Sequence, residues 1–382
     1  LRHRRRVQPD VRAVAAVRRG QARPAMIITR YVSRRLAANV VIVLIVITTL
    51  SLTFELMEEG DNIAKHAGSV VPAISRYVFL RLPEVIAELL PFAALLGAVI
   101  AVGLLLRHSE IVAIWNSGIS AFGLMRSVLP VGLVLVAIQI GLDDRLVPPT
   151  RAALETWGVG KAAEREGMLA RATASVWLLT DEGDVVHIPK SAATASRFAG
   201  LEIFRRDENG QLVAYSFAED ARRDGSRWLL SNVTRRSVNP PAIEKIPYMD
   251  WQPPEAVEHI PLISKLLRDL RLDQLWRLVV HNGYGQKSAG VYRTWFHYRI
   301  ASALSPLLLI LLVVSLAQRF QRTGTFVRLM ISSIAIGFGY MVFEGMSLSM
   351  GEAGLLAPFI AGWGPAVLLV SVIGYLTLAR SG

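Results

Sequence analysis

The segment at residues 107–118 carries the most informative chemistry in the chain. It reads Arg107-His-Ser-Glu-Ile-Val-Ala-Ile-Trp-Asn-Ser-Gly118 and lies between two apolar stretches. Ser109 can cap the start of a helix, the residues after it give that helix an apolar face, and Gly118 can end it in a left-handed conformation. Glu110 then offers a carboxylate to a basic group of another protein. A short amphipathic helix of this kind either docks a partner subunit or lies on a bilayer surface.

Motifs for nucleotide or metal chemistry are missing from the sequence. A phosphate-binding loop needs Gly, four residues and then Gly-Lys-Ser/Thr, but the Gly160-Lys161 pair is followed by Ala162. The chain has no cysteine, and its seven histidines lack the H-E-x-x-H spacing of a zinc hydrolase. We therefore expect no catalytic residue, no metal site and no cofactor in this chain.

Four uncharged apolar stretches set the class of protein. Each is 18 to 27 residues long, and together they cover residues 36–54, 89–106, 300–318 and 353–379. A helix of that length can cross the ~30 Å hydrocarbon core of a bilayer. Moreover, only 19% of the residues are charged, whereas a soluble domain has about 25%. These features exclude a soluble enzyme and a disordered chain.

Two less uniform stretches bring the expected number of membrane-spanning helices to six. Glu344 is the deepest carboxylate in any of them, and this scarcity of ionisable groups disfavours an enzyme embedded in the membrane. Because a carboxylate facing lipid is costly, Glu344 either faces a cavity or lies near the bilayer surface. The six helices are expected at residues 35–56, 89–106, 125–147, 300–318, 329–350 and 355–378.

The charges in the short connections predict the orientation of these helices. The first 35 residues hold 11 Arg and one Asp, and the turn at residues 319–328 has three Arg and no acid. By contrast, the connector at residues 55–88 has six acids and three bases. Because basic connections stay in the cytoplasm, both termini are expected there and residues 148–295 outside. The net charge of +12 is thus a matter of topology, and without a basic patch with interleaved aromatics we expect no nucleic-acid partner.

This pattern divides the chain into four parts. A basic tail at residues 1–25 is either disordered and attracted to anionic lipid or the product of an over-extended gene start before Met26. Helices 1–3 occupy residues 26–147, with the amphipathic segment near residues 108–118. The outer block and its return helix occupy residues 148–295, and helices 4–6 occupy residues 296–382.

Short β-rich runs separated by turns fill the first part of the outer block. Such spacing is typical of an antiparallel sandwich or an open jelly roll. Residues 240–261 are rich in Pro and poor in strand signals, and residues 262–280 predict a helix leading back to the membrane. The runs lie at residues 176–188, 201–204, 212–215 and 227–234. Inward-facing residues that either line an open groove or form an ordinary core are Trp177, Leu179, Ile203, Phe204, Trp228 and Leu230.

Several motifs resemble one family of membrane permeases. The stretch Pro91-Phe-Ala-Ala-Leu-Leu-Gly97 and residues 107–119 resemble the LptF/LptG permeases of lipopolysaccharide export, and Gly362-Trp-Gly-Pro365 is closer to the LptG branch. That family has six helices and an outer domain between the third and the fourth. The expected fold is therefore an α-helical membrane protein with six transmembrane helices and an inserted periplasmic all-β domain resembling a jelly roll.

The resemblance implies an ATP-driven exporter in the bacterial inner membrane. An LptF-type permease would pair with this chain, and a cytoplasmic ABC ATPase dimer would bind ATP and magnesium. A single-span regulatory subunit and a periplasmic bridge protein would complete the assembly. Lipopolysaccharide would leave the membrane and pass through the periplasmic domain to the bridge. Glu110 falls on the coupling-helix acid of the family, and the ATPase-coupling residues are then Arg107, Glu110, Ile111, Ile114 and Trp115.

One departure from the family concerns the outer end of helix 1. LptG relatives carry basic residues there for the anionic head group, whereas this chain has Glu55, Glu58, Glu59 and Asp61. Acids would repel phosphates, so we expect the head group to be met elsewhere. The candidates for substrate contact are Lys65, Arg76, Arg81, Glu344, Phe54, Phe338 and Met341. The three bases are alternatively solvated charges, Glu344 an acid near the bilayer surface, and the apolar residues ordinary lipid-facing side chains.

The sequence thus predicts the membrane subunit of an ABC exporter for lipopolysaccharide. The alternative from another class is a membrane anchor without transport activity, whose outer β domain binds a partner protein. An anchor would tolerate a change at Glu110, whereas the exporter subunit would lose its ATPase.

Overall fold

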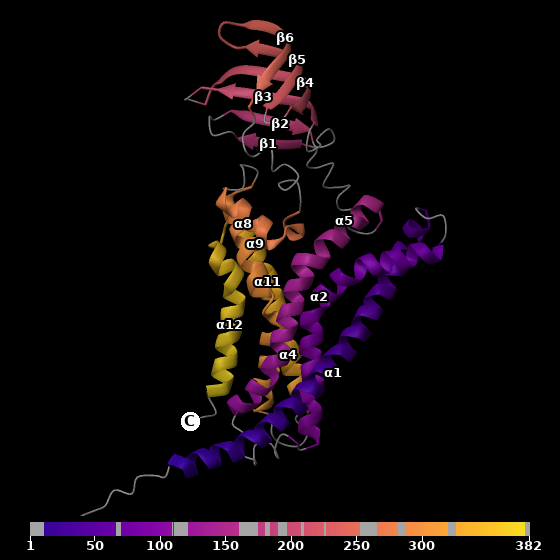
Figure 1. The fold of residues 1–382 in the computed structure, drawn as a ribbon, viewed down its shortest axis with the longest axis vertical. Coiled ribbons are helices and arrows are strands. Elements are labelled where there is room, and N and C mark those ends of the chain that lie inside the picture. Colours follow the sequence, from indigo (N-terminus) through magenta and orange to yellow (C-terminus); the bar gives the residue numbers. More distant parts are fainter. Residues whose placement is uncertain are drawn as a thin grey trace, which may run out of the picture.

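A bundle of long helices with an antiparallel sheet at one end makes up the computed structural model of the chain (Figure 1). The sheet lies beyond the ends of α5 and α8, and the C-terminal end of α2 lies at the opposite end of the bundle. The structure describes residues 11–65, 70–108, 110, 121–159, 175–179, 184–189, 197–207, 210–224, 227–252, 266–281, 287–319 and 326–378.

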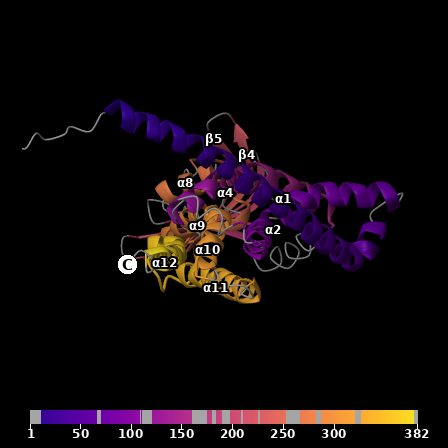
Figure 2. The ribbon, with the colours of Figure 1, turned by 90° about the horizontal axis from the view of Figure 1, so that it is seen from below.

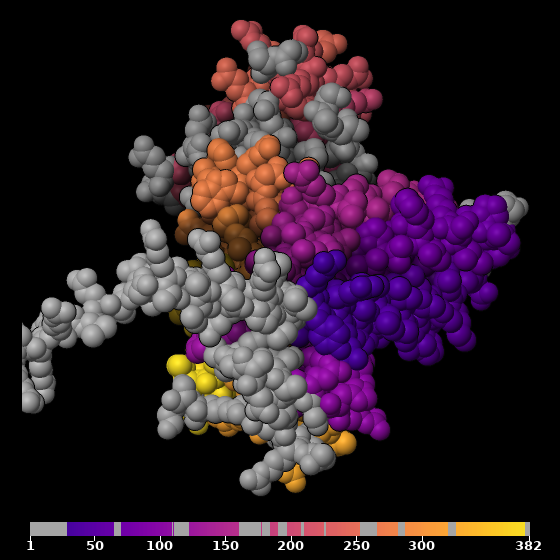
Figure 3. All heavy atoms as spheres, turned by 60° about the horizontal axis from the view of Figure 1, so that its bottom comes forward, coloured from indigo at the N-terminus to yellow at the C-terminus, as the bar shows by residue number. Residues whose placement is uncertain are grey.

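The first two helices, α1 (Val11–Lys65) and α2 (Val70–Arg107), pack on each other and form a lobe that projects from the molecule (Figures 1 and 3). The apolar span of α1, Thr29–Ala64, has 36 residues and is about 54 Å long at ~1.5 Å per residue. It therefore extends well beyond a ~30 Å hydrocarbon core. Most of the expected connector between the two helices is helical. Helix α1 also starts within the expected basic tail, where Ala and Arg favour a helix.

The remaining helices follow the predicted spans with two irregularities. A π-helical turn, η1 (Leu142–Leu146), joins α4 (Ala121–Gly141) to α5 (Val147–Trp157). A bend of 47° separates α9 (Ala289–Ser302) from α10 (Ser305–Ala317), where Pro306 at the start of α10 cannot donate to the helical ladder. The chain ends with α11 (Phe326–Glu352) and α12 (Pro358–Leu378).

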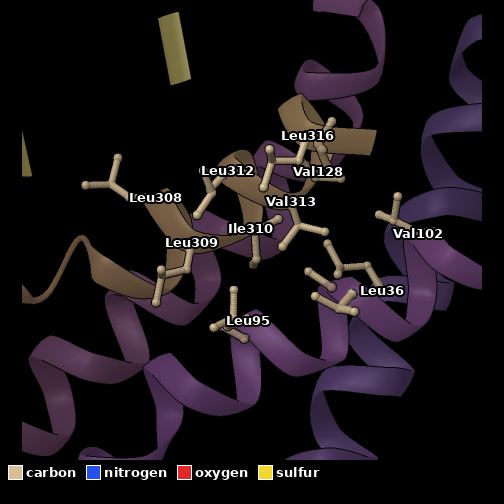
Figure 4. Packing of buried hydrophobic residues seen from close by; sticks show 14 of the residues in the cluster. Leu36, Leu95, Val102, Val128, Leu308, Leu309, Ile310, Leu312, Val313 and Leu316 are labelled. Atoms are coloured by element: carbon tan, nitrogen blue, oxygen red, sulfur yellow. The ribbon is translucent and has the colours of Figure 1, made fainter. Parts of the chain in front are cut away.

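Counting spans confirms the helical membrane part of the prediction. Among the described residues, five helices are long and apolar enough to cross a membrane, or six if the bent pair is one span. Helix α10 is their centre, because it is apolar on all sides and almost every one of its residues is buried. Its buried side chains belong to one cluster with Leu36 of α1, Leu95 of α2 and Val128 of α4 (Figure 4).

Helices α1 and α11 leave large apolar side chains uncovered. The two helices lie on different sides of α10 (Figure 2). In the apolar stretch of 18 residues that qualifies each helix as a membrane span, only 22% of the residues are buried. Helix α1 packs on α2 and α4, whereas α11 packs on α2, α9, α10 and α12. Faces of this kind suit lipid or another membrane helix.

The described residues of the outer block form a six-stranded antiparallel sheet in which each strand pairs with the next along the chain. The hairpins expected around residues 176–188 and 201–215 are present. The antiparallel β character is thereby confirmed, whereas the jelly-roll arrangement stays a prediction. The strands are β1 (Ser175–Leu179), β2 (Val185–Pro189), β3 (Arg197–Arg206), β4 (Leu212–Asp224), β5 (Arg227–Ser237) and β6 (Ala242–Trp251).

Two expectations for the end of the outer block were wrong. The stretch 240–261 was expected to be poor in strands, but its described part, up to residue 252, contains β6. Its Pro247 is tolerated since β6 pairs with β5 alone among the described strands. The return helix is shorter than residues 262–280: a 3₁₀ turn, η4 (Leu267–Asp269), precedes α8 (Leu272–Val280). The extended backbone at Leu270 and Arg271 separates the two.

Candidate functional site

Glu110, just beyond the end of α2, is bound by two side chains of α1. Both of its carboxylate oxygens lie 3.1 Å from Nη1 of Arg35, and the hydroxyl of Tyr31 donates to Oε2 at 2.9 Å. The Arg35 and Glu110 side chains are 34% and 31% exposed. We call Tyr31, Arg35 and Glu110 the Glu110 triad. Its carboxylate is thus oriented by the chain and still accessible to another protein.

The other expected coupling residues are only partly visible. Arg107 is exposed at the last turn of α2, which suits a contact with another subunit. Ile111, Ile114 and Trp115 lie outside the described residues. The amphipathic coupling helix therefore stays a prediction.

A chain of alternating charges occupies the opposite end of α1 and α2. Glu55 accepts hydrogen bonds from the Tyr77 hydroxyl at 3.0 Å and from Nε of Arg81 at 2.7 Å. Arg81 also pairs with Glu84, Glu84 with Arg151 on α5, and Arg151 with Asp269 on η4. We call Glu55, Arg81, Glu84, Arg151 and Asp269 the ion chain. It joins α1 and α2 to the segments that lead into and out of the sheet.

The ion chain changes how the acids of helix 1 should be interpreted. Of the four acids there, Glu55 and Glu59 are buried in the protein, whereas Glu58 and Asp61 are exposed, so only two of them face outward. Arg81 is neutralised by two carboxylates and only 16% of its side chain is exposed, which leaves little of it for a lipid phosphate. Arg76 is exposed but lies over the ring of Trp157, 4.7 Å from its centroid. The side chain of Lys65 lies outside the described part.

A cavity of about 380 Å³ lies beside the ion chain, between α2, η1, α9, α10 and α11. Glu344 lines it and accepts a hydrogen bond from Ser305 at 3.4 Å. The structure therefore places Glu344 in the wall of a cavity, and Met341 lines the same space. Phe54 and Phe338, each 59% exposed, are on uncovered faces of α1 and α11. The other charged residues of the cavity wall are Glu84, Glu88, Asp143, Arg151, Arg268 and Arg299.

Sequence reasoning missed most of these cavity residues and also Asp144, which follows the cavity residue Asp143 in the chain. Arg299 donates to the main-chain oxygens of Arg268, at 2.6 Å, and of Leu270, and Asp144 accepts from the amide of Leu272 at 2.7 Å. These contacts join residues more than 25 positions apart, so spacing along the chain could not reveal them. The available signal was the position of Asp144 and Arg299 at the edges of apolar stretches, where an ionisable group needs a partner.

The six expected groove residues do not share one surface. Ile203, Trp228 and Leu230 are buried on one face of the sheet. Trp177 and Phe204 lie on the other face, with ring centroids 5.8 Å apart, because alternate residues of a strand point to opposite faces. The side chain of Leu179 lies outside the described part.

Trp177 and Phe204 belong to a row of aromatic and polar side chains across four strands. Nδ1 of His187 lies 2.8 Å from Glu202, and the hydroxyl of Tyr215 donates to the same carboxylate at 3.0 Å. Burial and this hydrogen bond raise the pKa of Tyr215. The ring of Trp177 is 4.2 Å from that of His187, and 48% of Trp177 is exposed. This face is an amphipathic surface, distinct from the apolar core face.

A helical bundle that crosses a membrane several times, with an antiparallel sheet inserted between its third and fourth spans, defines a multi-pass membrane protein with an extramembrane β domain. The family described as lipopolysaccharide export system permease LptF/LptG matches residues 30–379. The match covers the bundle and the sheet, and the chain belongs to this family. The resemblance noted in the sequence is thereby confirmed.

Relatives in two bacteria carry the name lipopolysaccharide export system permease protein LptG. The protein of Escherichia coli K12 is 21% identical over 326 residues, which are 84% of this chain and 89% of the relative. The protein of Haemophilus influenzae Rd is 21% identical over 355 residues, or 91% of this chain and 97% of the relative. Both alignments extend through the membrane helices and the sheet.

Proposed function

We propose that this chain is the LptG-type membrane subunit of an ATP-driven exporter. It takes lipopolysaccharide from the bacterial inner membrane and passes it, through a periplasmic β domain of jelly-roll type, to a bridge towards the outer membrane. The observation that carries the proposal is the family match over residues 30–379, because it spans the membrane bundle and the inserted sheet together.

The uncovered helices support a second permease as partner. Phe54 on α1 and Phe338 on α11 are exposed, and these two helices lie on different sides of α10 (Figure 2). A lateral gate made from the first and fifth spans therefore needs one of these helices from an LptF-type subunit. Acyl chains would enter between two such faces. A single-span regulatory subunit and the periplasmic bridge protein complete the proposed assembly.

The energy source lies in other subunits. Because the sequence has no phosphate-binding loop, ATP and magnesium are assigned to a cytoplasmic ABC ATPase dimer. The carboxylate of Glu110, oriented and about one-third exposed, is the group of this chain that an ATPase cation would contact. Lipid release from the reconstituted complex, measured with and without ATP, tests the activity as a whole.

Glu110→Lys tests the docking contact. Reversing this charge places an ammonium group against the Arg35 side chain and against any cation of the ATPase. We expect the amount of ATPase that co-purifies with the permease to fall about tenfold or more, since like charges across an interface cost several kcal/mol. Asp61→Lys, at an exposed acid on the other end of α1, should leave the complex intact. Undiminished co-purification with Glu110→Lys would favour the alternative, a membrane anchor without transport activity.

A further inference from the structure

The Glu110 triad connects residues that are far apart in the sequence. Tyr31 and Arg35 precede Glu110 by 79 and 75 positions, and they belong to a different helix from the one that leads to it. The guanidinium of Arg35 also lies over the ring of Tyr31, 5.3 Å from its centroid. Each of the three side chains therefore contacts the other two. The carboxylate of Glu110 is thus held in place by α1.

The geometry leaves the carboxylate able to bind a further cation. An ionised carboxylate has about four acceptor positions. Arg35 reaches both oxygens with a single nitrogen, and Tyr31 uses one further position. Among the contacts of the described residues, at least one position thus stays open on a side chain that is 31% exposed. Arg35 and an arginine of a docked subunit can consequently share Glu110.

The part of α1 that holds Glu110 is firmly packed. Leu36 is buried in the main core, and the hydroxyl of Ser33 donates to the main-chain oxygen of Ser127 on α4 at 2.5 Å. Further along, a Cβ atom on Gly97 of α2 would lie 2.6 Å from the Cα of Val40, so the two backbones are in close contact. A displacement of Arg35 must therefore carry this section of α1 with it.

We propose that Arg35 and Tyr31 are positioning residues that transmit the movement of Glu110 to α1. The proposal rests on the proposed function, in which the ATPase contacts Glu110. An ion pair exposed to this extent adds little to stability. Its main effect is therefore to fix the distance and the orientation of Arg35 relative to Glu110. ATP-driven displacement of Glu110 then reaches the first membrane helix through two side-chain contacts, without passing along the whole of α2.

The reconstituted complex offers a direct test with Arg35→Gln and Tyr31→Phe. Both changes leave Glu110 free to bind the ATPase, so co-purification of the ATPase and its rate of hydrolysis should be retained. Lipid released per ATP hydrolysed should fall about two- to fivefold for Arg35→Gln, the factor that an ion pair about one-third exposed supports, and less for Tyr31→Phe. Arg34→Gln, which removes an exposed arginine of the same helical turn, should leave the ratio unchanged.

Two further variants separate the possible outcomes. Arg35→Lys keeps a cation but loses the planar guanidinium, so it should recover part of the lipid released per ATP. The inference is overturned if the lipid released per ATP is unchanged in both Arg35→Gln and Tyr31→Phe, or if lipid release and ATP hydrolysis fall together. If Glu110→Lys still loses the ATPase in that case, the docking proposal stands and this inference alone fails. If Glu110→Lys retains the ATPase, the docking proposal fails and this inference fails with it. Because Tyr31→Phe removes one oxygen atom, it keeps the test valid even if the arginine variants fold poorly.

Discussion

Arg151 of the ion chain binds two carboxylates that come from distant parts of the protein. Glu84 belongs to α2 and Asp269 to η4, after the sheet. The side chains of Arg151 and Glu84 are each 6% exposed, so neither charge has much access to water. Replacing Arg151 by Met would leave both carboxylates without this partner, and removing one member of a buried ion pair costs ~3–5 kcal/mol. We expect a clearly lower midpoint of thermal unfolding in detergent.

Arg145→Met provides the matched control for this prediction. Arg145 is exposed on the neighbouring turn η1, so its loss should change the midpoint little. Adding Glu84→Gln and Asp269→Asn to Arg151→Met neutralises the two carboxylates that lost Arg151 as a partner and should recover part of the stability. A midpoint for Arg151→Met equal to that of Arg145→Met would contradict a stabilising role for the ion chain.

At the scale of the elements, close approaches between helices depend on glycine. A Cβ atom on Gly362 of α12 would lie 2.6 Å from the Cβ of His297 and 2.7 Å from the amide nitrogen of Tyr298, both on α9. Gly362→Ala must therefore separate two backbones, and overpacking of this kind costs ~1–3 kcal/mol. Gly374 lies in the same helix with nothing within 4 Å of such an atom, so Gly374→Ala should be neutral or stabilising. Thermal unfolding of the two variants in detergent compares them, and equal midpoints would refute the close approach.

The elements also show what a sequence can and cannot predict. The apolar stretches predict the membrane helices because the bilayer sets a minimum length for an uncharged helix. They do not give the ends, since α1 continues past its apolar part with residues that favour a helix. Strand β6 was missed because Pro247 is normally a sign against a strand, and only its place at the edge of the described sheet makes it acceptable.

The candidate site was predictable in part, for similar reasons. Glu110 was identified from its local motif, and its partner Arg35 was not, because the contact depends on how α1 packs on α2. The groove residues were grouped by apolar character alone. Trp177 pairs with His187, and His187 pairs with Glu202, the neighbour of Ile203 in β3. Trp177 therefore lies on the face opposite the buried Ile203, and this assignment needs the register of the strands, which the sequence alone does not give.

At the scale of the whole molecule, the ion chain and the Glu110 triad lie towards opposite ends of the same pair of helices. The triad holds α1 beside the end of α2, and the ion chain holds α1 and α2 to the segments flanking the sheet. Between them, α1 is held by its packing on α2 and α4 and leaves its apolar face uncovered. Movement at one end of α1 therefore has a continuous set of contacts through which it can reach the base of the β domain.

This arrangement has a function in export only if its two ends lie on opposite sides of the membrane. The chain has no cysteine, so a single introduced thiol reports one position. Gln211→Cys, exposed beside the β3–β4 turn, should react with a membrane-impermeant maleimide once the outer membrane is permeabilised. His108→Cys, exposed at the end of α2, should react only after the inner membrane is opened, because basic connections are retained in the cytoplasm. Labelling of residue 108 from outside, or of residue 211 from the cytoplasm alone, would reverse the topology and exclude delivery of lipid by the β domain to a periplasmic bridge.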